Sequence, residues 1–268
     1  MGYFKVKQLA ALISITALGL ISEVAAYGAN SDTAILAEID YEPHFGFVAP
    51  GIERLKLLSI YATHYNIPTV NSDFESAQTI RLRDRDGRPI SDPISRFAFC
   101  NAANQGSLRI RSVEDGNEYQ VFNSSGSTKI PYADCSDVFV KNKKIGVDAA
   151  RQAFFKVPFK FGEGVRGSRL IPYRSVAVDR HFIPYGSVLY IPSLRGFKTP
   201  YGIHDGYVIA NDTGRGIIGN HIDVYVGSPF DPYPAFVSIP QKPKVFPAYL
   251  ISESVVRAQL AKLTDWKF

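Results

Sequence analysis

The sequence predicts an all-β protein, and three observations support this fold class. Aromatic residues are plentiful, with 15 tyrosines and 18 phenylalanines, and such side chains suit the pleated, half-buried surface of a strand. Short apolar runs alternate with turns that contain Asp-Gly pairs, which favour β-hairpins. Three aspartates lie where such runs end or begin. A chain of 268 residues that is 46% hydrophobic can form one large domain or two small ones.

The N-terminal 26 residues have the composition of an export signal. Lys5 and Lys7 precede an apolar stretch over residues 9–21, and residues 24–26 (Val-Ala-Ala) place small side chains at a cleavage site. The apolar stretch is short for a membrane span. We therefore expect cleavage near Ala26 and a periplasmic or secreted protein with no membrane span in the mature chain. An uncleaved N-terminal anchor is the alternative.

The charge is compatible with an anionic partner such as the bacterial envelope and does not argue for nucleic acid. The formal net charge is +5, and loss of two lysines and one glutamate with the signal changes it to +4. A modest positive charge suits binding to the bacterial envelope. The basic residues form no long run, and no nucleic-acid-binding motif is present, so we expect no nucleic-acid partner.

The two cysteines, Cys100 and Cys135, are expected to form a disulfide. Both fall in the exported part of the chain, and two cysteines in an oxidising compartment most simply pair. A nucleophilic cysteine is the alternative, but no motif places a histidine beside either one.

The first part of the chain divides into an arm, a strand and an insertion. Residues 27–56 contain scattered prolines and glycines and are expected to form an extended N-terminal arm. Residues 57–63 have the β-branched and aromatic content of a buried strand. From about 69 to 147, charged turns separate short alternating runs, as at 107–111 and 118–122, which indicates a β-rich inserted lobe with the disulfide inside it.

The second part returns to strands and ends in a helix. Strands are expected at residues 175–178, 187–191, 207–211 and 222–226. Residues 229–247 are rich in proline and are expected to form an irregular surface wrap. Residues 252–262 have the apolar spacing of one amphipathic helix, with Ser252 as its cap.

Asp212 and Asp223 are the most informative residues of the chain. They lie at the two ends of a loop that contains Gly214, Gly216 and Gly219. Glycine tolerates positive φ and gives no steric cover, so this loop can hold two acids near each other and open to a ligand. Asp179 ends another apolar run, at 175–178. Three carboxylates at strand ends indicate a site for acid–base chemistry.

Two segments around these acids resemble a known family. Residues 177–191 (Ala-Val-Asp-Arg-His-Phe-Ile-Pro-Tyr-Gly-Ser-Val-Leu-Tyr-Ile) and residues 208–225 (Val-Ile-Ala-Asn-Asp-Thr-Gly-Arg-Gly-Ile-Ile-Gly-Asn-His-Ile-Asp-Val-Tyr) resemble the 3D domain, named for its three aspartates. That domain occurs in MltA-type membrane-bound lytic transglycosylases. The resemblance is close over residues 175–227 and extends to the strand at 61–65, where the family has a similar aromatic-rich segment.

The resemblance implies a fold, a reaction and a set of site residues. The fold is a six-stranded double-psi β-barrel, here spanning residues 57–228 with the insertion at about 69–147, followed by the wrap and helix of residues 229–268. The reaction is cleavage of the β-1,4 bond between N-acetylmuramic acid and N-acetylglucosamine in peptidoglycan glycan strands. By position, Asp223 resembles the catalytic acid/base, and Asp179 and Asp212 match the other two aspartates. The substrate-binding residues expected around them are Thr213, Gly214, Arg215, Gly216, His221 and Tyr225.

The chain also departs from the family pattern. The family loop usually reads Asp-Thr-Gly-Gly-Ala-Ile-Lys-Gly, whereas Arg215 here replaces a glycine and Ile218 replaces the lysine. Arg215 can supply the missing charge from the other side of the loop, or the site is altered or inactive. No cysteine for a lipid anchor lies near the signal, in contrast to the MltA type.

Several alternatives stay open on the sequence. Asp-Thr-Gly and the second acid can be turn residues whose carboxylates bond to backbone amides. An aspartic protease is disfavoured because it needs two Asp-Thr-Gly motifs or a dimer, and this chain has one such motif. The five histidines show no metal-ligand spacing, although His204-Asp205 and His221 make a zinc site conceivable. We expect no cofactor and no metal.

Two other functions compete with the lytic reaction. One is a non-catalytic glycan-binding module on the same barrel, which the loss of the loop lysine favours. The other is an envelope interaction protein, which predicts a large exposed apolar patch away from the acids.

Overall fold

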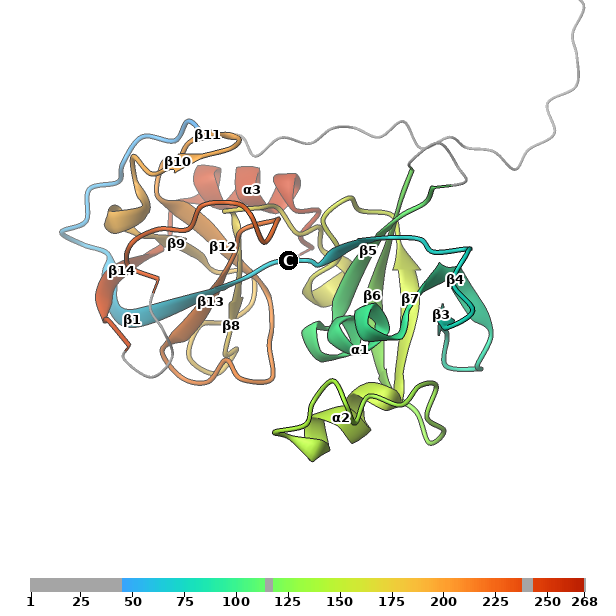
Figure 1. Ribbon diagram of the computed structural model, residues 1–268. Helices are drawn as coiled ribbons and strands as arrows, with labels where there is room; N and C mark the ends of the chain where they lie inside the picture. Colours follow the sequence, from blue (N-terminus) through green and yellow to red (C-terminus); the bar gives the residue numbers. More distant parts are fainter. Residues whose placement is uncertain (1–44, 114–117, 238–242, 268) are drawn as a thin grey trace, which may run out of the picture. The chain divides into compact units, whose positions relative to one another are not determined.

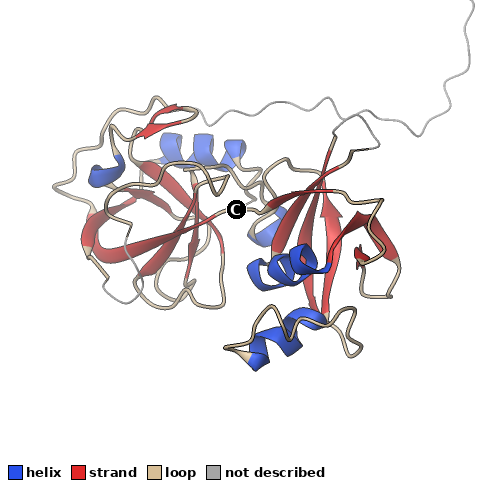
Figure 2. Ribbon diagram, viewed as in Figure 1, coloured by secondary structure: helices blue, strands red, loops and turns tan. Residues whose placement is uncertain are grey.

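The computed structural model describes residues 45–113, 118–237 and 243–267. The expected export signal and most of the expected N-terminal arm lie outside these residues. Strands make up most of the described secondary structure (Figure 2). Within the described ranges, no helix has the length and apolar character needed to cross a bilayer.

Six strands close into a mixed barrel, as the family resemblance implies (Figure 1). Around the barrel they follow the order β1, β13, β8, β12, β9 and β14. Two neighbouring pairs, β1 with β13 and β8 with β12, are parallel, and the other four are antiparallel. The bounds are β1 (Lys56–Tyr65), β8 (Ser175–Val178), β9 (Val188–Tyr190), β12 (Tyr207–Asp212), β13 (His221–Tyr225) and β14 (Phe246–Ile251).

The barrel closes because alternate side chains of its strands fill its interior. In β1 the inward residues include Ile60 and Ala62, and in β13 they are Ile222 and Val224; all four are 0% exposed. Successive side chains of a strand point to opposite faces. The residues between these apolar positions therefore lie on the outer face of the barrel, where chemistry can take place.

The helix α3 (Ser254–Leu263) covers part of the outer face. Its Val256 and Leu260 pack with Trp266 against side chains from β9, β12 and β14. The sequence prediction of a helix here is confirmed, but the predicted cap is wrong. The N-cap residue is Glu253, and its side chain makes no capping bond. Ser252 lies one residue too early because β14 runs as far as Ile251.

The last barrel strand corrects the predicted boundaries. The sequence predicts an irregular wrap over residues 229–247 and a barrel that ends at residue 228, yet β14 begins at Phe246 and pairs with both β1 and β9. The sequence does not predict this strand because Pro247 lies within it, and a proline argues against a strand. The Pro247 side chain is exposed while Phe246 and Ala248 on either side are buried, so the segment keeps the two-residue period of a strand.

The inserted region forms a second β-rich unit. Its four-stranded sheet has the order β2 (Thr69–Asn71), β5 (Ser107–Arg111), β6 (Tyr119–Ser127) and β7 (Gln152–Val157). A two-stranded sheet pairs β3 (Thr79–Arg83) with β4 (Pro89–Ser95). The strand β7 lies beyond the expected end of the insertion at residue 147. A small ribbon elsewhere pairs β10 (Lys198–Thr199) with β11 (Gly202–Ile203), and the short helices are η1 (Val165–Gly167) and η2 (Pro192–Leu194).

The inserted unit also contains two helices that the sequence patterns do not predict. They are α1 (Arg96–Gln105), capped by the Ser95 side chain, and α2 (Lys143–Ala150), capped by Asn142. Side chains of α1 such as Phe99 and Ala102 are fully buried against the sheet. A polar cap followed by small apolar residues is the available signal for both helices.

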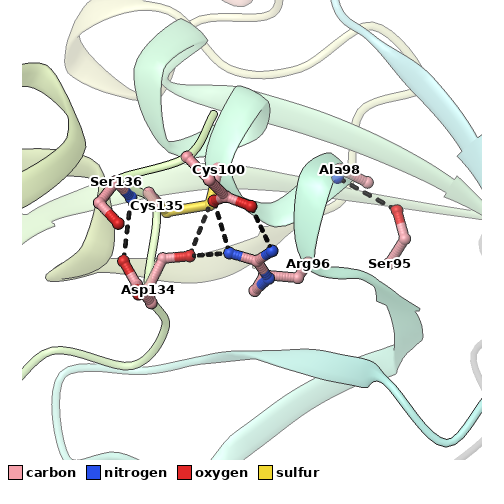
Figure 3. Close-up of a disulfide and its surroundings, with 8 residues drawn as sticks. Ser95, Arg96, Ala98, Cys100, Asp134, Cys135 and Ser136 are labelled. Carbon is pink, nitrogen blue, oxygen red and sulfur yellow. Dashed lines mark hydrogen bonds and ion pairs between the residues drawn. A yellow bond between two sulfur atoms is a disulfide. The ribbon is translucent and has the colours of Figure 1, made fainter. Parts of the chain in front are cut away.

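The predicted disulfide joins Cys100 of α1 to Cys135 (Figure 3). Both cysteines are almost fully buried in the core of the inserted unit. Beside them, the Arg96 guanidinium donates to the Asp134 backbone carbonyl (Figure 3). It also donates to both oxygens of the Asp137 carboxylate. The segment that carries Cys135 is therefore attached to α1 by a covalent bond and an exposed ion pair.

The disulfide should contribute much of the stability of this unit. The bond closes a loop with a sequence separation of 35. We expect the double variant Cys100→Ala, Cys135→Ala to lose on the order of 3 kcal/mol of unfolding free energy, mainly because its unfolded chain is less restricted. Chemical denaturation followed by circular dichroism measures the loss. Reductant should lower the midpoint of the wild type alone. Equal stability of the two proteins would contradict the prediction.

Candidate active site

The candidate site is built on the parallel pair of β1 and β13. The register places Tyr61 opposite His221, Thr63 opposite Asp223 and Tyr65 opposite Tyr225. These residues alternate with the inward-facing positions of both strands. The fold therefore lines up three polar or aromatic pairs on the outer face of the barrel. The expected acid, Asp223, lies in the middle of the row.

Among the described residues, one side-chain hydrogen bond positions the Asp223 carboxyl. The Thr63 hydroxyl donates to its Oδ1 at 2.7 Å. Within the described residues its other oxygen, Oδ2, takes part in no hydrogen bond with the protein. Burial raises the pKa of Asp223 to about 6, although the bond from Thr63 acts in the opposite direction. Near pH 6 this carboxyl is therefore protonated in about half of the molecules, and one of its oxygens is available to a ligand.

Asp212 lies at the end of β12, beside an irregularity in the pairing of β12 with β8. Both of its oxygens are bonded: the Tyr65 hydroxyl donates to Oδ2 at 2.5 Å, and the Thr213 amide donates to Oδ1 at 2.8 Å. Burial raises the pKa of Asp212 to about 6, against the effect of these two bonds, and the charge of Asp223 raises it further. The structure thus brings Asp212 and Asp223 into electrostatic contact.

Asp179 has a different environment. Its Oδ1 accepts from the His181 amide at 2.9 Å, and its Oδ2 accepts from the Gly219 amide at 2.9 Å. These bonds, that from Gly219 first, lower the pKa of Asp179. The carboxylate is ionised and holds the end of the glycine-rich loop. This arrangement favours the structural alternative for Asp179 over direct participation in proton transfer.

The glycine-rich loop between Asp212 and Asp223 is largely exposed. Its exposed residues include four of the expected substrate-binding positions, namely Thr213, Gly214, Arg215 and Gly216. Ile218, which stands where the family has lysine, is 71% exposed. The loop is therefore open to a ligand, with one cationic and one apolar side chain on it.

His221 and Tyr225, the other two expected substrate-binding residues, lie on β13 on either side of Asp223. The His221 ring stacks on Tyr61 with centroids 4.5 Å apart, and its Nε2 lies 2.8 Å from the Thr63 hydroxyl. Burial lowers the pKa of His221. The Tyr225 ring is 0% exposed and packs against Tyr65, so it supports the site and offers no face for stacking on a sugar.

Two residues that touch the acids are not identified from the sequence. Thr63 bonds to Asp223, and Tyr65 bonds to Asp212. Both lie about 150 residues before the acids in sequence, far from the glycine-rich loop. The alternation of Tyr61, Thr63 and Tyr65 is the only sequence signal for these partners. The parallel register of β1 with β13 cannot be predicted from one sequence.

The histidines do not form a metal centre in the part of the chain that the structure describes. No group of three or more His, Cys, Asp or Glu side chains converges there. His204 is occupied by the backbone: its Nε2 contacts the Tyr173 carbonyl and its Nδ1 accepts from the Gly206 amide. Asp205 is bound to Arg174. These residues stabilise the barrel.

Comparison with protein families matches residues 174–235 to the 3D domain, which confirms the resemblance seen in the sequence. No curated protein matches the chain significantly. Among solved structures, Escherichia coli MltA with bound chitohexaose is similar, at 18% identity and a TM-score of 0.48, over 72% of this chain and 71% of that one.

Two further solved structures are similar to a comparable extent. They are the lytic transglycosylase LtgG of Burkholderia pseudomallei, at 17% identity and a TM-score of 0.42 over 73% of each chain, and MltA of Neisseria gonorrhoeae, at 13% identity and a TM-score of 0.47 over 73% of each chain. Similarity at this level does not establish a shared activity, so the residues themselves must support any function.

Proposed function

We propose that this protein is a lytic transglycosylase that cleaves the N-acetylmuramic acid–N-acetylglucosamine β-1,4 bond of peptidoglycan, with Asp223 as its single acid/base. The observation that carries this proposal is the difference in hydrogen bonding between Asp212 and Asp223, the two carboxyls whose pKa is raised. Both oxygens of Asp212 are bonded to the protein, whereas, among the residues that the structure describes, only Oδ1 of Asp223 is bonded. Of these two carboxyls, Asp223 alone combines a raised pKa with an oxygen that a substrate can reach.

One carboxyl is sufficient for the lytic reaction. Oδ2 of protonated Asp223 gives its proton to the glycosidic oxygen as the bond from that oxygen to the anomeric carbon breaks. The positive charge that develops on the sugar is that of an oxocarbenium-like transition state. The sugar's own 6-hydroxyl then attacks the anomeric carbon and closes a 1,6-anhydro ring. Its proton passes to Oδ2, which restores the acid, and no water is consumed.

Asp212 supports this cycle without exchanging the proton. Its carboxyl is held by Tyr65 and Thr213, and its ionised form places negative charge near the sugar as positive charge develops. Fixed charges directed at the transition state are a major source of rate enhancement. The exposed loop with Arg215 provides the surface on which a glycan strand binds.

We infer the cleaved glycosidic bond and the substrate class from the 3D-domain resemblance over residues 175–227. The expected export signal fits an exported, periplasmic or secreted location. The proposed reaction needs no cofactor. The glycan-binding module is the second candidate, because the loop presents exposed Ile218 where the family has a lysine.

Purified sacculi separate these two candidates. The protein is mixed with insoluble peptidoglycan, and both the bound protein and the soluble sugar released are measured. A transglycosylase releases soluble fragments over time, whereas a binding module sediments with the sacculi and releases none. Binding without release would refute the catalytic proposal.

The proposed acid also sets the pH dependence of turnover. Because Asp223 must start protonated and its pKa is about 6, we expect kcat to fall by about tenfold per pH unit well above pH 6. Initial rates on soluble glycan strands in constant-ionic-strength buffers measure this limb. A rate that rises from pH 6 to pH 8 would contradict the assignment.

A further inference from the structure

Thr63 connects the proposed catalytic acid to a histidine. Its Oγ1 lies 2.7 Å from Oδ1 of Asp223 and 2.8 Å from Nε2 of His221. The two partners are two residues apart on β13, and Thr63 faces them from the parallel neighbour β1. A third contact, of 3.3 Å, joins Nδ1 of His221 to the backbone carbonyl of Gly216 in the glycine-rich loop.

The direction of the Thr63–Asp223 bond sets the direction of the Thr63–His221 bond. Thr63 has one hydroxyl hydrogen and a neutral imidazole has one N–H. When the hydroxyl donates to Asp223, its oxygen can only accept from His221, so Nε2 must carry the hydrogen of the ring. The Gly216 contact, which is the longest of the three, then has no hydrogen unless His221 is protonated.

We propose that His221 and Thr63 are positioning residues that form a directed relay, Nε2–H to Oγ1 and Oγ1–H to Oδ1, and so assign the transferable proton to Oδ2 of Asp223. The inference rests on the proposed role of Asp223. The relay occupies Oδ1 in both protonation states of the acid. It leaves Oδ2 as the oxygen that gives and recovers the proton.

The surroundings of the relay support this assignment. Burial lowers the pKa of His221, which keeps the ring neutral near neutral pH, and stacking on Tyr61 fixes its plane. The charge of Asp223 also raises the pKa of two other titratable groups, Asp212 on β12 and Tyr65 on β1. The opposite neighbour strand, β8, presents Ala177 to it.

The relay also tunes the strength of the acid. A hydrogen bond donated to a carboxylate stabilises its ionised form, and the bond from Thr63 lowers the pKa of Asp223 against the effect of burial. Without the relay the carboxyl would hold its proton more tightly and release it less readily to the leaving oxygen. Neighbouring donors in one chain polarise each other, so His221 strengthens the bond that Thr63 makes.

Three variants of the full-length protein test the relay. Thr63→Val keeps the shape of the side chain and removes the hydroxyl, Thr63→Ser restores a hydroxyl, and His221→Phe keeps a ring on Tyr61 without a donor. Ser59→Ala is the matched control, because Ser59 lies on the same strand with an exposed side chain. NMR with labelled histidine and aspartate gives the His221 tautomer and the titration of Asp223.

We expect wild-type His221 to be the neutral Nε2–H tautomer. In Thr63→Val the pKa of Asp223 should rise and the alkaline limb of kcat should move to higher pH, with kcat at least about tenfold lower, since bonds to charged groups are the stronger ones. His221→Phe should shift both in the same direction and less. Thr63→Ser and Ser59→Ala should titrate as the wild type does.

Two outcomes would overturn the relay: a wild-type His221 in the Nδ1–H tautomer, or a Thr63→Val variant in which Asp223 titrates unchanged. These NMR readouts do not need turnover. A protein that shows the expected tautomer and titration but releases no sugar would refute the proposed function and leave the relay standing. An active wild type, together with a Thr63→Val variant in which the pKa of Asp223 is unchanged, would refute the relay and leave the proposed function standing.

Discussion

Replacement of Asp223 by asparagine should abolish turnover while the fold persists. Asparagine has nearly the same shape, and its amide oxygen can still accept the bond from Thr63, but it has no proton to give to the leaving oxygen. General acid–base catalysis typically contributes 10²–10⁴-fold, so we expect kcat on glycan strands to fall by roughly that factor. Release of soluble sugar from sacculi measures the fall, and sedimentation with sacculi should be unchanged.

The stability of the same variant provides an internal check. Burial in the folded state raises the pKa of Asp223 to about 6 from its ordinary value of 3.8, so between these values the folded protein binds the proton more tightly than the unfolded chain. This contribution is fully present below about pH 4 and is lost as the pH rises through about 6.

Asp223→Asn should therefore gain stability relative to the wild type as the pH rises from about 4 to about 8, by on the order of 3 kcal/mol. Asp86→Asn, at an exposed position of the inserted unit, is the control for both measurements. Wild-type turnover in Asp223→Asn would remove Asp223 from the catalytic role.

Loss of Asp205 should cause a larger loss of stability than any other single substitution proposed for this protein. Its carboxylate makes two bonds to the Arg174 guanidinium, at 2.6 and 2.8 Å, and both side chains are almost completely buried. Burial alone would raise the pKa of Asp205. The hydrogen bonds that Arg174 donates, together with its positive charge, outweigh burial and lower the pKa to about 2. Asp205 also accepts the amides of Gly46 and Phe47.

Asp205→Ala leaves the Arg174 charge buried with its main partner removed. Such a change typically costs about 3–5 kcal/mol, and here it also releases residues 46 and 47 from the barrel. The double variant Arg174→Met, Asp205→Leu should recover part of this loss, because it removes both charges. Denaturant titration compares the two variants.

The exposed pair of Arg96 and Asp137 provides the contrast. Its side chains are 43% and 59% exposed, so solvent screens the pair and Asp137→Ala should cost much less stability than Asp205→Ala. The contribution of Asp205 is present above about pH 4 and should be lost as the pH falls through about 2. If Asp205→Ala were as stable as Asp137→Ala, Arg174 and Asp205 would not anchor the N-terminal segment.

The barrel was largely predictable because its strands are short apolar runs with clear boundaries. The strand at 175–178 is predicted at its observed bounds, and those near 188, 207 and 222 agree within one residue or two. The strand β14 was missed because Pro247 lies inside it, at a position where its side chain is exposed. A proline in a strand normally argues against one.

The acids of the site were readable from the sequence, but their partners were not. Asp212 and Asp223 flank a glycine-rich loop, and that pattern is local. Thr63 and Tyr65 reach them only through the parallel pairing of β1 with β13. A register between strands so distant in sequence depends on the closure of the whole barrel, which no local pattern encodes.

The product of glycan cleavage tests the central claim most directly. Wild-type protein and Asp223→Asn are incubated with purified peptidoglycan, and the new saccharide ends are identified by mass spectrometry. We expect the wild type to produce N-acetylmuramic acid ends that carry the 1,6-anhydro ring, lighter by one water than hydrolysed ends, and Asp223→Asn to produce none. Reducing ends from the wild type, or anhydro ends from Asp223→Asn, would contradict a lytic reaction driven by this aspartate.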